Sequence, residues 1–156
     1  MPVPTVEPKT SILSLVKTNW VPENIVGTTT PDFHTGWWNP KVLGPQFTFT
    51  GPSETFEGES GFGAIQGGGG GPVQIADGVL FGNCWAFRDE GAGGQNPKQV
   101  VYGMAKEARR IVLANYDGIT NLTFVSILRI DEPPPMPGPP LVFRKAVTFG
   151  YNWRTT

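Results

Sequence analysis

The amino-acid sequence predicts an α+β fold, in which a small, mostly antiparallel sheet packs on one main helix and long irregular loops connect the elements. Residues 78–154 follow the order strand, helix, strand, strand, and only the segment after Asn96 has a long helical pattern. Glycine and proline contribute 21 and 16 of the 156 residues, which limits helix and favours irregular connections. A chain of this length fits a single domain over residues 1–156 with a real core.

The N-terminal third predicts one short helix and one strand. Ile12, Val16 and Trp20 recur at helical spacing, which predicts a helix over residues 10–19. Residues 45–50 alternate in polarity and predict a strand with its two phenylalanines on one face.

Two segments are expected to be irregular. Residues 22–45 are rich in Thr, Gly and Pro. Residues 51–77 contain a run of five glycines and predict an extended glycine-rich loop or arm. Loops of this length are unusual in compact domains. The second segment is therefore a mobile arm, an inserted hairpin, or a segment that a partner orders.

The main helix is predicted to begin at Asn96, a good N-cap, with Pro97 as its first residue and Gln99 completing a capping box. Its apolar positions form one face: Val101, Met104, Ala105, Ala108, Ile111 and Val112. The charged residues are expected to lie largely away from that face: Lys98, Lys106, Glu107, Arg109 and Arg110.

Three strands are predicted in the C-terminal half, over residues 78–88, 122–130 and 141–154. In the first, the odd-numbered positions from 79 to 87 point one way, and the smaller residues between them suit close packing of a helix. Residues 131–140 hold six prolines and predict a stiff connection. The last strand is expected to be either a sheet edge or a subunit-contact element.

Charge and composition exclude several classes of partner. The formal net charge of −1 gives no global attraction to nucleic acid or to a membrane surface. Residues 1–80 carry a net −4 and residues 81–156 a net +3, a split that suits head-to-tail association between copies. No apolar run is long enough to span a bilayer, and no signal-peptide pattern is visible, so we expect a cytoplasmic origin.

The residue types needed for catalysis or metal binding do not combine into a site. His34 is the only histidine and Asp32 alone cannot complete a metal site with it. Cys84 lies inside a predicted strand, where a buried thiol is favoured over a nucleophile. The glycines of residues 61–67 have the wrong spacing and context for nucleotide binding. We therefore expect no catalytic residues, no cofactor and no metal.

The remaining aromatic and charged residues are better explained as contacts with other subunits than as a ligand-binding site. Aromatic and charged side chains in loops or on outer faces are typical of protein interfaces. The candidate contact residues are Trp37, Trp38, Glu54, Glu57, Glu59, Phe62, Arg109, Arg110 and Trp153. A sharper hypothesis pairs Arg109 and Arg110 of one subunit with the acidic residues of the 51–77 segment of another.

Several segments together resemble the tail-terminator and head–tail connector (neck) proteins of tailed bacterial and archaeal viruses. The resemblance rests on the strand end NCWA (83–86), the helix NPKQVVYGMAKEARRIVLAN (96–115), the strands at 122–130 and 142–154, and the N-terminal ILSL (12–15), NW (19–20) and PQF (45–47). It implies an α/β sandwich and a ring subunit, commonly hexameric, that terminates the tail tube and joins it to the neck and head. The implied partners are copies of itself, a tail tube protein and a neck or head-completion protein, in the virion.

The glycine-rich stretch at 58–71 and the proline-rich segment at 133–140 depart from this family pattern. Another position in the neck or tail is therefore an open alternative. A second alternative is a non-catalytic carbohydrate-binding module that uses Trp37 and Trp38. An enzyme is the least favoured reading, since it needs His34 or Cys84 beside a carboxylate in a pocket.

Overall fold

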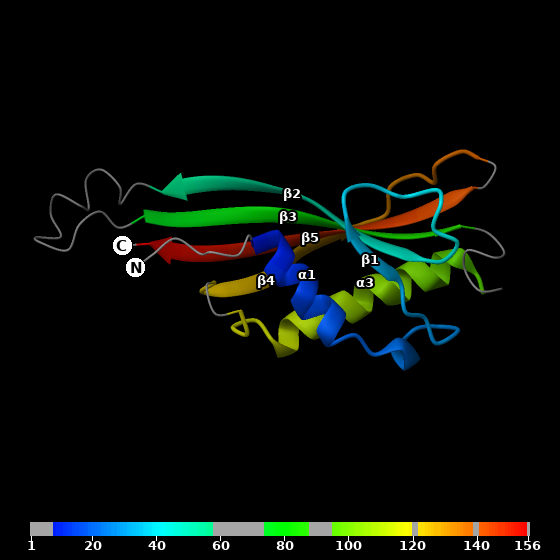
Figure 1. Cartoon of the computed structure of the whole chain (residues 1–156), viewed down its shortest axis with the longest axis horizontal. Coiled ribbons are helices and arrows are strands. Elements are labelled where there is room, and N and C mark those ends of the chain that lie inside the picture. The colour runs from blue at the N-terminus through cyan, green and yellow to red at the C-terminus, as the bar shows by residue number, and fades with distance from the viewer. Residues whose placement is uncertain (1–7, 58–73, 88–94, 120–121, 139–140, 156) are drawn as a thin grey trace, which may run out of the picture.

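The computed structural model describes residues 8–57, 74–87, 95–119, 122–138 and 141–155. They form one five-stranded sheet with helices on one of its faces (Figure 1). The strands, in spatial order, are β1 (Asp32–Thr35), β2 (Gln46–Glu57), β3 (Gln74–Phe87), β5 (Val142–Thr155) and β4 (Phe124–Asp131). The helices are α1 (Pro8–Thr18), the short 3₁₀ helix η1 (Pro22–Asn24) and α3 (Pro97–Ala114).

The sheet is mixed but mostly antiparallel, as the sequence predicts. Strands β2, β3, β5 and β4 pair antiparallel in that order, and only β1 runs parallel to its neighbour β2. The last strand was expected to be either a sheet edge or a subunit-contact element, and the first alternative is wrong, because β5 pairs with β3 on one side and with β4 on the other. It is instead an interior strand, because β4 pairs with the edge of β5 that faces away from β3.

The two helices define a core face of the sheet, and we call the opposite face the outer face. Helix α3 contacts β3, β4 and β5, while α1 contacts β1, β2 and α3 (Figure 1). The alternation predicted for β3 is confirmed: Leu80, Cys84 and Ala86 are fully buried in the core beneath the helices. Small side chains at Cys84 and Ala86 allow a helix to approach the sheet closely.

Helix α3 begins as expected, at Pro97 after the N-cap Asn96. The Asn96 side chain accepts a hydrogen bond from the backbone N–H of Lys98 at 3.0 Å. A capping box places this bond on the N–H of Gln99, so the cap is one residue tighter than predicted. The predicted apolar face is buried along its whole length, which fixes α3 on the sheet.

Strands β2 and β3 extend further than the sequence predicts. Residues 51–57 and 74–77, expected to belong to the glycine-rich loop or arm, lie within these strands, and residues 53–57 pair with residues 75–79 in the ladder. A register shift between Thr50 and Ser53 accommodates Pro52, which has no backbone N–H for the ladder. The rest of the expected arm lies outside the described residues.

Strand β1 was not anticipated, because its four residues lie within a stretch rich in Thr, Gly and Pro. Phe33 of β1 stacks on Phe47 of β2 with ring centroids 5.8 Å apart, and Trp20 packs edge-on against both rings. The strand is therefore held by an aromatic cluster that joins it to the end of α1. Of the helices described, none is long and apolar enough to cross a membrane.

Candidate functional site

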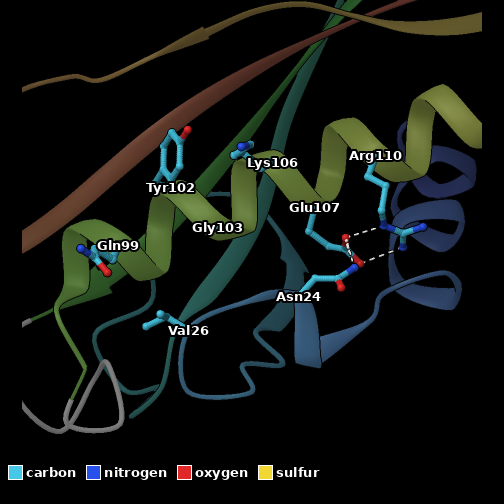
Figure 2. Close-up of a pocket in the computed structure, with 8 residues that line it drawn as sticks. All are labelled: Asn24, Val26, Gln99, Tyr102, Gly103, Lys106, Glu107 and Arg110. Carbon is cyan, nitrogen blue, oxygen red and sulfur yellow. Dashed lines mark hydrogen bonds and ion pairs between the residues drawn. The ribbon is translucent and has the colours of Figure 1, made fainter.

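A groove of about 710 Å³ lies between α3 and the segment around η1. Figure 2 shows its lining side chains, which come from one side of α3 and from the turn below it. They are Asn24, Val26, Gln99, Tyr102, Gly103, Lys106, Glu107 and Arg110. Gly103 lets the two segments approach, since a Cβ there would lie only 3.1 Å from Cγ2 of Ile25.

Glu107 is the central polar group of this groove, and it is only 2% exposed. Its carboxylate accepts hydrogen bonds from the backbone N–H of Val21 at 2.8 Å and from the Asn24 amide at 2.9 Å. Arg110 completes the set with Nε at 2.6 Å and Nη2 at 2.8 Å (Figure 2). The expectation that Glu107 lies away from the packed face is wrong, because its partners lie in a segment 83 and 86 residues earlier.

These contacts decide the ionisation of Glu107. Burial acts to raise the pKa of its carboxyl, but hydrogen bonds from Arg110, Asn24 and Val21 together outweigh burial, so the pKa lies below its ordinary value. An ionised carboxylate with four donors around it is a poor general acid or base. Glu107 therefore fastens α3 to the η1 segment.

The two arginines predicted as contact residues have different surroundings. Arg110 uses its guanidinium within the chain, on Glu107 and on the carbonyl oxygen of Asn19 at 3.0 Å. Arg109 is exposed on the outer side of α3. Of the pair, only Arg109 presents a guanidinium without a hydrogen bond in the described part of the chain.

Trp37 and Trp38 lie in the loop between β1 and β2, which folds over one end of the outer face. Trp37 is 51% exposed, and its ring meets that of Trp85 edge-on with centroids 4.7 Å apart. Trp38 is half-buried and packs edge-on against Phe87. We call Trp37, Trp38, Trp85, Phe87 and Arg144 the outer aromatic cluster. The sequence predicted the exposed tryptophan but not the residues beneath it.

Hydrogen bonds fix this loop to the sheet. The buried side-chain amide of Gln46 accepts from the backbone N–H of Asn39 and donates to its carbonyl, both at 2.8 Å. The indole N–H of Trp85 donates to the hydroxyl of Thr48 at 2.9 Å. These bonds hold the loop against β2 and fix the Trp85 side chain on the neighbouring strand.

The acidic candidates lie at the opposite end of the long strands. Tyr151 of β5 reaches across Gly78 of β3 and donates its hydroxyl hydrogen bond to Glu54 of β2. Glu57 and Trp153 belong to β2 and β5, but their side chains are outside the described structure. Glu59 and Phe62 lie outside the described residues altogether. The chain thus separates Glu54 from the outer aromatic cluster, with much of the sheet between them.

His34 and Cys84 have surroundings that do not suit catalysis. His34 Nδ1 lies 2.7 Å from Asp32, and its Nε2 lies 3.2 Å from the carbonyl oxygen of Trp37, so both ring nitrogens are occupied. Burial raises the pKa of the Cys84 thiol well above its usual value, which keeps it protonated and unreactive. The described residues contain no group of three or more His, Cys, Asp or Glu that could hold a metal ion.

Comparison with known proteins adds no relative to these observations. Neither the family models nor the curated proteins include a match to this chain. The function must therefore be argued from the geometry of the chain itself.

Proposed function

We propose that this protein is a non-catalytic structural subunit of a tailed virion, which forms a ring that terminates the tail tube and joins it to the neck. The observation that carries the proposal is the one-sided construction of the fold. Both helices pack on the core face, and large apolar side chains remain exposed on the outer face and at the β4 edge. Exposed apolar surface of this kind is typical of protein interaction sites.

Four of the exposed apolar residues lie on two strands, β3 and β4, which are separated only by β5. Phe81 of β3 is 43% exposed, and Leu128 of β4, which covers Gly150 on the outer face, is 58% exposed. Phe124 and Ile130 of β4 are 43% and 36% exposed. Strand β4 is also a sheet edge, so one row of its backbone N–H and C=O groups has no strand partner in the described chain. Such an edge is a template for pairing with another chain.

A ring needs two different surfaces on each subunit, because neighbours meet head to tail. The β4 edge supplies one such surface, and the groove along α3 supplies a second on the opposite side of the sheet. The charge split between the halves of the chain, −4 before residue 81 and +3 after it, favours the same head-to-tail contact.

The native mass of the purified full chain, measured by light scattering over a range of concentrations and followed by negative-stain imaging, tests the ring. We expect closed rings of defined size. Mass spectrometry of purified virus particles separated into head, neck and tail fractions tests the location. A strictly monomeric chain at high concentration that is absent from all particle fractions would contradict the proposal, whereas recovery in another tail fraction would favour a different neck or tail subunit.

A carbohydrate-binding module is the second candidate, supported by the exposed ring of Trp37. Sugars stack on free aromatic faces, but the guanidinium carbon of Arg144 already lies 4.9 Å from the centroid of this ring. Trp38 offers less free ring surface for a sugar, because its side chain is half-buried. Titration of a glycan panel, followed by tryptophan fluorescence, decides the matter: a saturable change that Trp37→Ala abolishes would favour this function over the ring.

A further inference from the structure

The exposed side of α3 is cationic. The helix contains five charged residues, and the four that are exposed are all basic: Lys98, Lys106, Arg109 and Arg110. Its one acid, Glu107, is 2% exposed and accepts four hydrogen bonds. Within α3, therefore, cations face the solvent without an exposed acid among them.

Lys106 and Arg109 have no acidic partner in the part of the chain that the structure describes. Arg110 is compensated by Glu107, whereas neither Lys106 nor Arg109 forms an ion pair with a described acid. At a rise of about 1.5 Å per residue, the two lie about 14 and 18 Å along the helix axis from Pro97. Both charges are thus remote from the residues that precede α3.

These two cations lie in one row with two apolar side chains. The row, which we call the α3 ridge, consists of Tyr102, Lys106, Arg109 and Leu113. Its members are three or four positions apart, the spacing that places residues on one face of a helix. Tyr102 and Leu113 are each more than half exposed. The ammonium of Lys106 lies 5.2 Å from the ring centroid of Tyr102. The ridge is therefore apolar at both ends and cationic in the middle.

The groove of about 710 Å³ shares Tyr102 and Lys106 with the α3 ridge. Gly103 leaves room in the groove because it has no side chain. In Figure 2, Tyr102 lies on one side of Gly103 and Val26 on the other, and Val26 is also exposed. Binding pockets usually hold about 300–1,000 Å³. An apolar side chain of a partner can therefore enter the groove between Tyr102 and Val26.

We propose that the α3 ridge and the adjoining groove bind an acidic segment of another protein, in which apolar side chains are interspersed with Asp or Glu. The carboxylates contact Lys106 and Arg109, where complementary charge favours association. The apolar side chains pack on Leu113 and enter the groove beside Tyr102. The proposal specifies the chemistry of the partner and does not rest on the ring, because any chain with such a segment fits the site.

A nucleic acid is the other class of partner that exposed cations attract. The formal net charge of −1, however, gives no global attraction for a polyanion. Unpaired bases need free aromatic faces on which to stack. The ring of Tyr102 is less free, since the ammonium groups of Lys106 and Lys145 lie 5.2 and 5.7 Å from its centroid. Leu113 and Val26 likewise suit aliphatic side chains better than phosphates, so an acidic protein segment is favoured.

The test is a fluorescence anisotropy titration with the purified full chain at low salt. The probe is a short fluorescein-labelled peptide of glutamate, leucine and glycine, and its neutral control has glutamine in place of every glutamate. A labelled oligothymidylate of similar length tests nucleic acid. We expect saturable binding of the acidic peptide and not of the two others. The binding should weaken as the salt concentration rises, because the charges that make it are exposed to solvent.

Charge reversal locates the binding surface. Lys106→Glu and Arg109→Glu are each expected to weaken binding of the acidic peptide about tenfold, since like charges then face each other. The matched control is Lys41→Glu, which changes the net charge by the same amount at an exposed position in the loop between β1 and β2. It should weaken binding less than about twofold, because it lies away from the site and is screened by salt. Circular dichroism checks that each variant is folded.

Tyr102→Ala tests the apolar part of the site. We expect weaker binding of the acidic peptide with the same salt dependence, because the variant removes apolar contact area but no charge. Three results would overturn the proposal: no binding of the acidic peptide at millimolar concentration, tighter binding of the oligothymidylate, or equal effects of Lys106→Glu and Lys41→Glu.

Discussion

Arg110 binds both carboxylate oxygens of Glu107, with Nε 2.6 Å from Oε1 and Nη2 2.8 Å from Oε2. The side chain of Glu107 is 1% exposed and that of Arg110 is 45% exposed, so the pair is buried at its acidic end and open at its basic end. The same carboxylate also accepts from Val21 and Asn24. One buried acid thus joins α3 to the segment that follows α1.

Glu107→Ala is expected to destabilise the fold by about 3 kcal/mol, since it removes several charge-assisted hydrogen bonds and leaves the Val21 N–H unsatisfied. The exposed guanidinium of Arg110 can form hydrogen bonds with water in the variant, which limits the loss of stability. Urea unfolding followed by tryptophan fluorescence measures the change. The matched control is Glu23→Ala in η1, an exposed acid whose removal should cost less than about 0.5 kcal/mol. Equal losses for the two variants would show that Glu107 does not fasten the helix.

The lowered pKa of Glu107 also predicts how stability depends on pH. In the unfolded chain this carboxyl titrates near its ordinary value of 4.5, and in the folded chain it titrates lower. Between these two pKa values the unfolded state binds more protons, so the contribution of Glu107 is fully present above pH 4.5 and is lost as the pH falls through the folded pKa. Unfolding free energies measured from pH 6 downward should therefore fall less steeply in Glu107→Gln than in the unaltered protein. Parallel profiles would contradict the assigned direction.

The fold was predictable wherever burial imposes a regular period. Strands β3 and β5 alternate along their length, and α3 carries an apolar stripe between a proline and an asparagine cap. The four-residue β1 was missed because it is too short to show a period. The ends of β2 and β3 were missed because they flank a run of five glycines that predicts a loop. The pairing continues past Pro52 only through a register shift.

The polar sites were much less predictable, because their partners are far apart in the sequence. In the sequence, Glu107 resembles any other charged helix residue. Its hydrogen bond from the backbone N–H of Val21, 86 residues earlier, appears only in the structure. The outer aromatic cluster draws its residues from a loop and from two antiparallel strands. The spacing of residues within one segment cannot predict contacts between segments that are far apart in the sequence. The alternation of β5 shows only that Arg144 lies on the face opposite the helices.

Gly82 is predicted to be intolerant of any side chain. A Cβ added there would lie 2.7 Å from Cε2 of Phe149 and 3.0 and 3.1 Å from Cε1 of Phe47 and Phe49. Because aromatic rings in a packed core cannot all move aside, we expect Gly82→Ala to cost about 1–3 kcal/mol. Gly44→Ala is the matched control, since nothing lies within 4 Å of the added Cβ, and its stability should be unchanged or slightly raised. Thermal unfolding of both variants measures the difference in stability. Equal losses of stability in Gly82→Ala and Gly44→Ala would refute the claim that close packing excludes a side chain at Gly82.

Leu128→Lys tests whether the outer face makes the subunit contact. Leu128 is 58% exposed, and the aliphatic stem of a lysine can still cover Gly150, so the free energy of unfolding should change by less than about 0.5 kcal/mol. The charged amine, however, would be desolvated in an interface, so we expect the native mass to fall from that of a ring to that of smaller species. Leu43→Lys makes the same substitution at a residue 76% exposed in the loop between β1 and β2, and it should leave the mass unchanged. An assembly that survives Leu128→Lys, or that both variants disrupt equally, would place the contact elsewhere on the subunit.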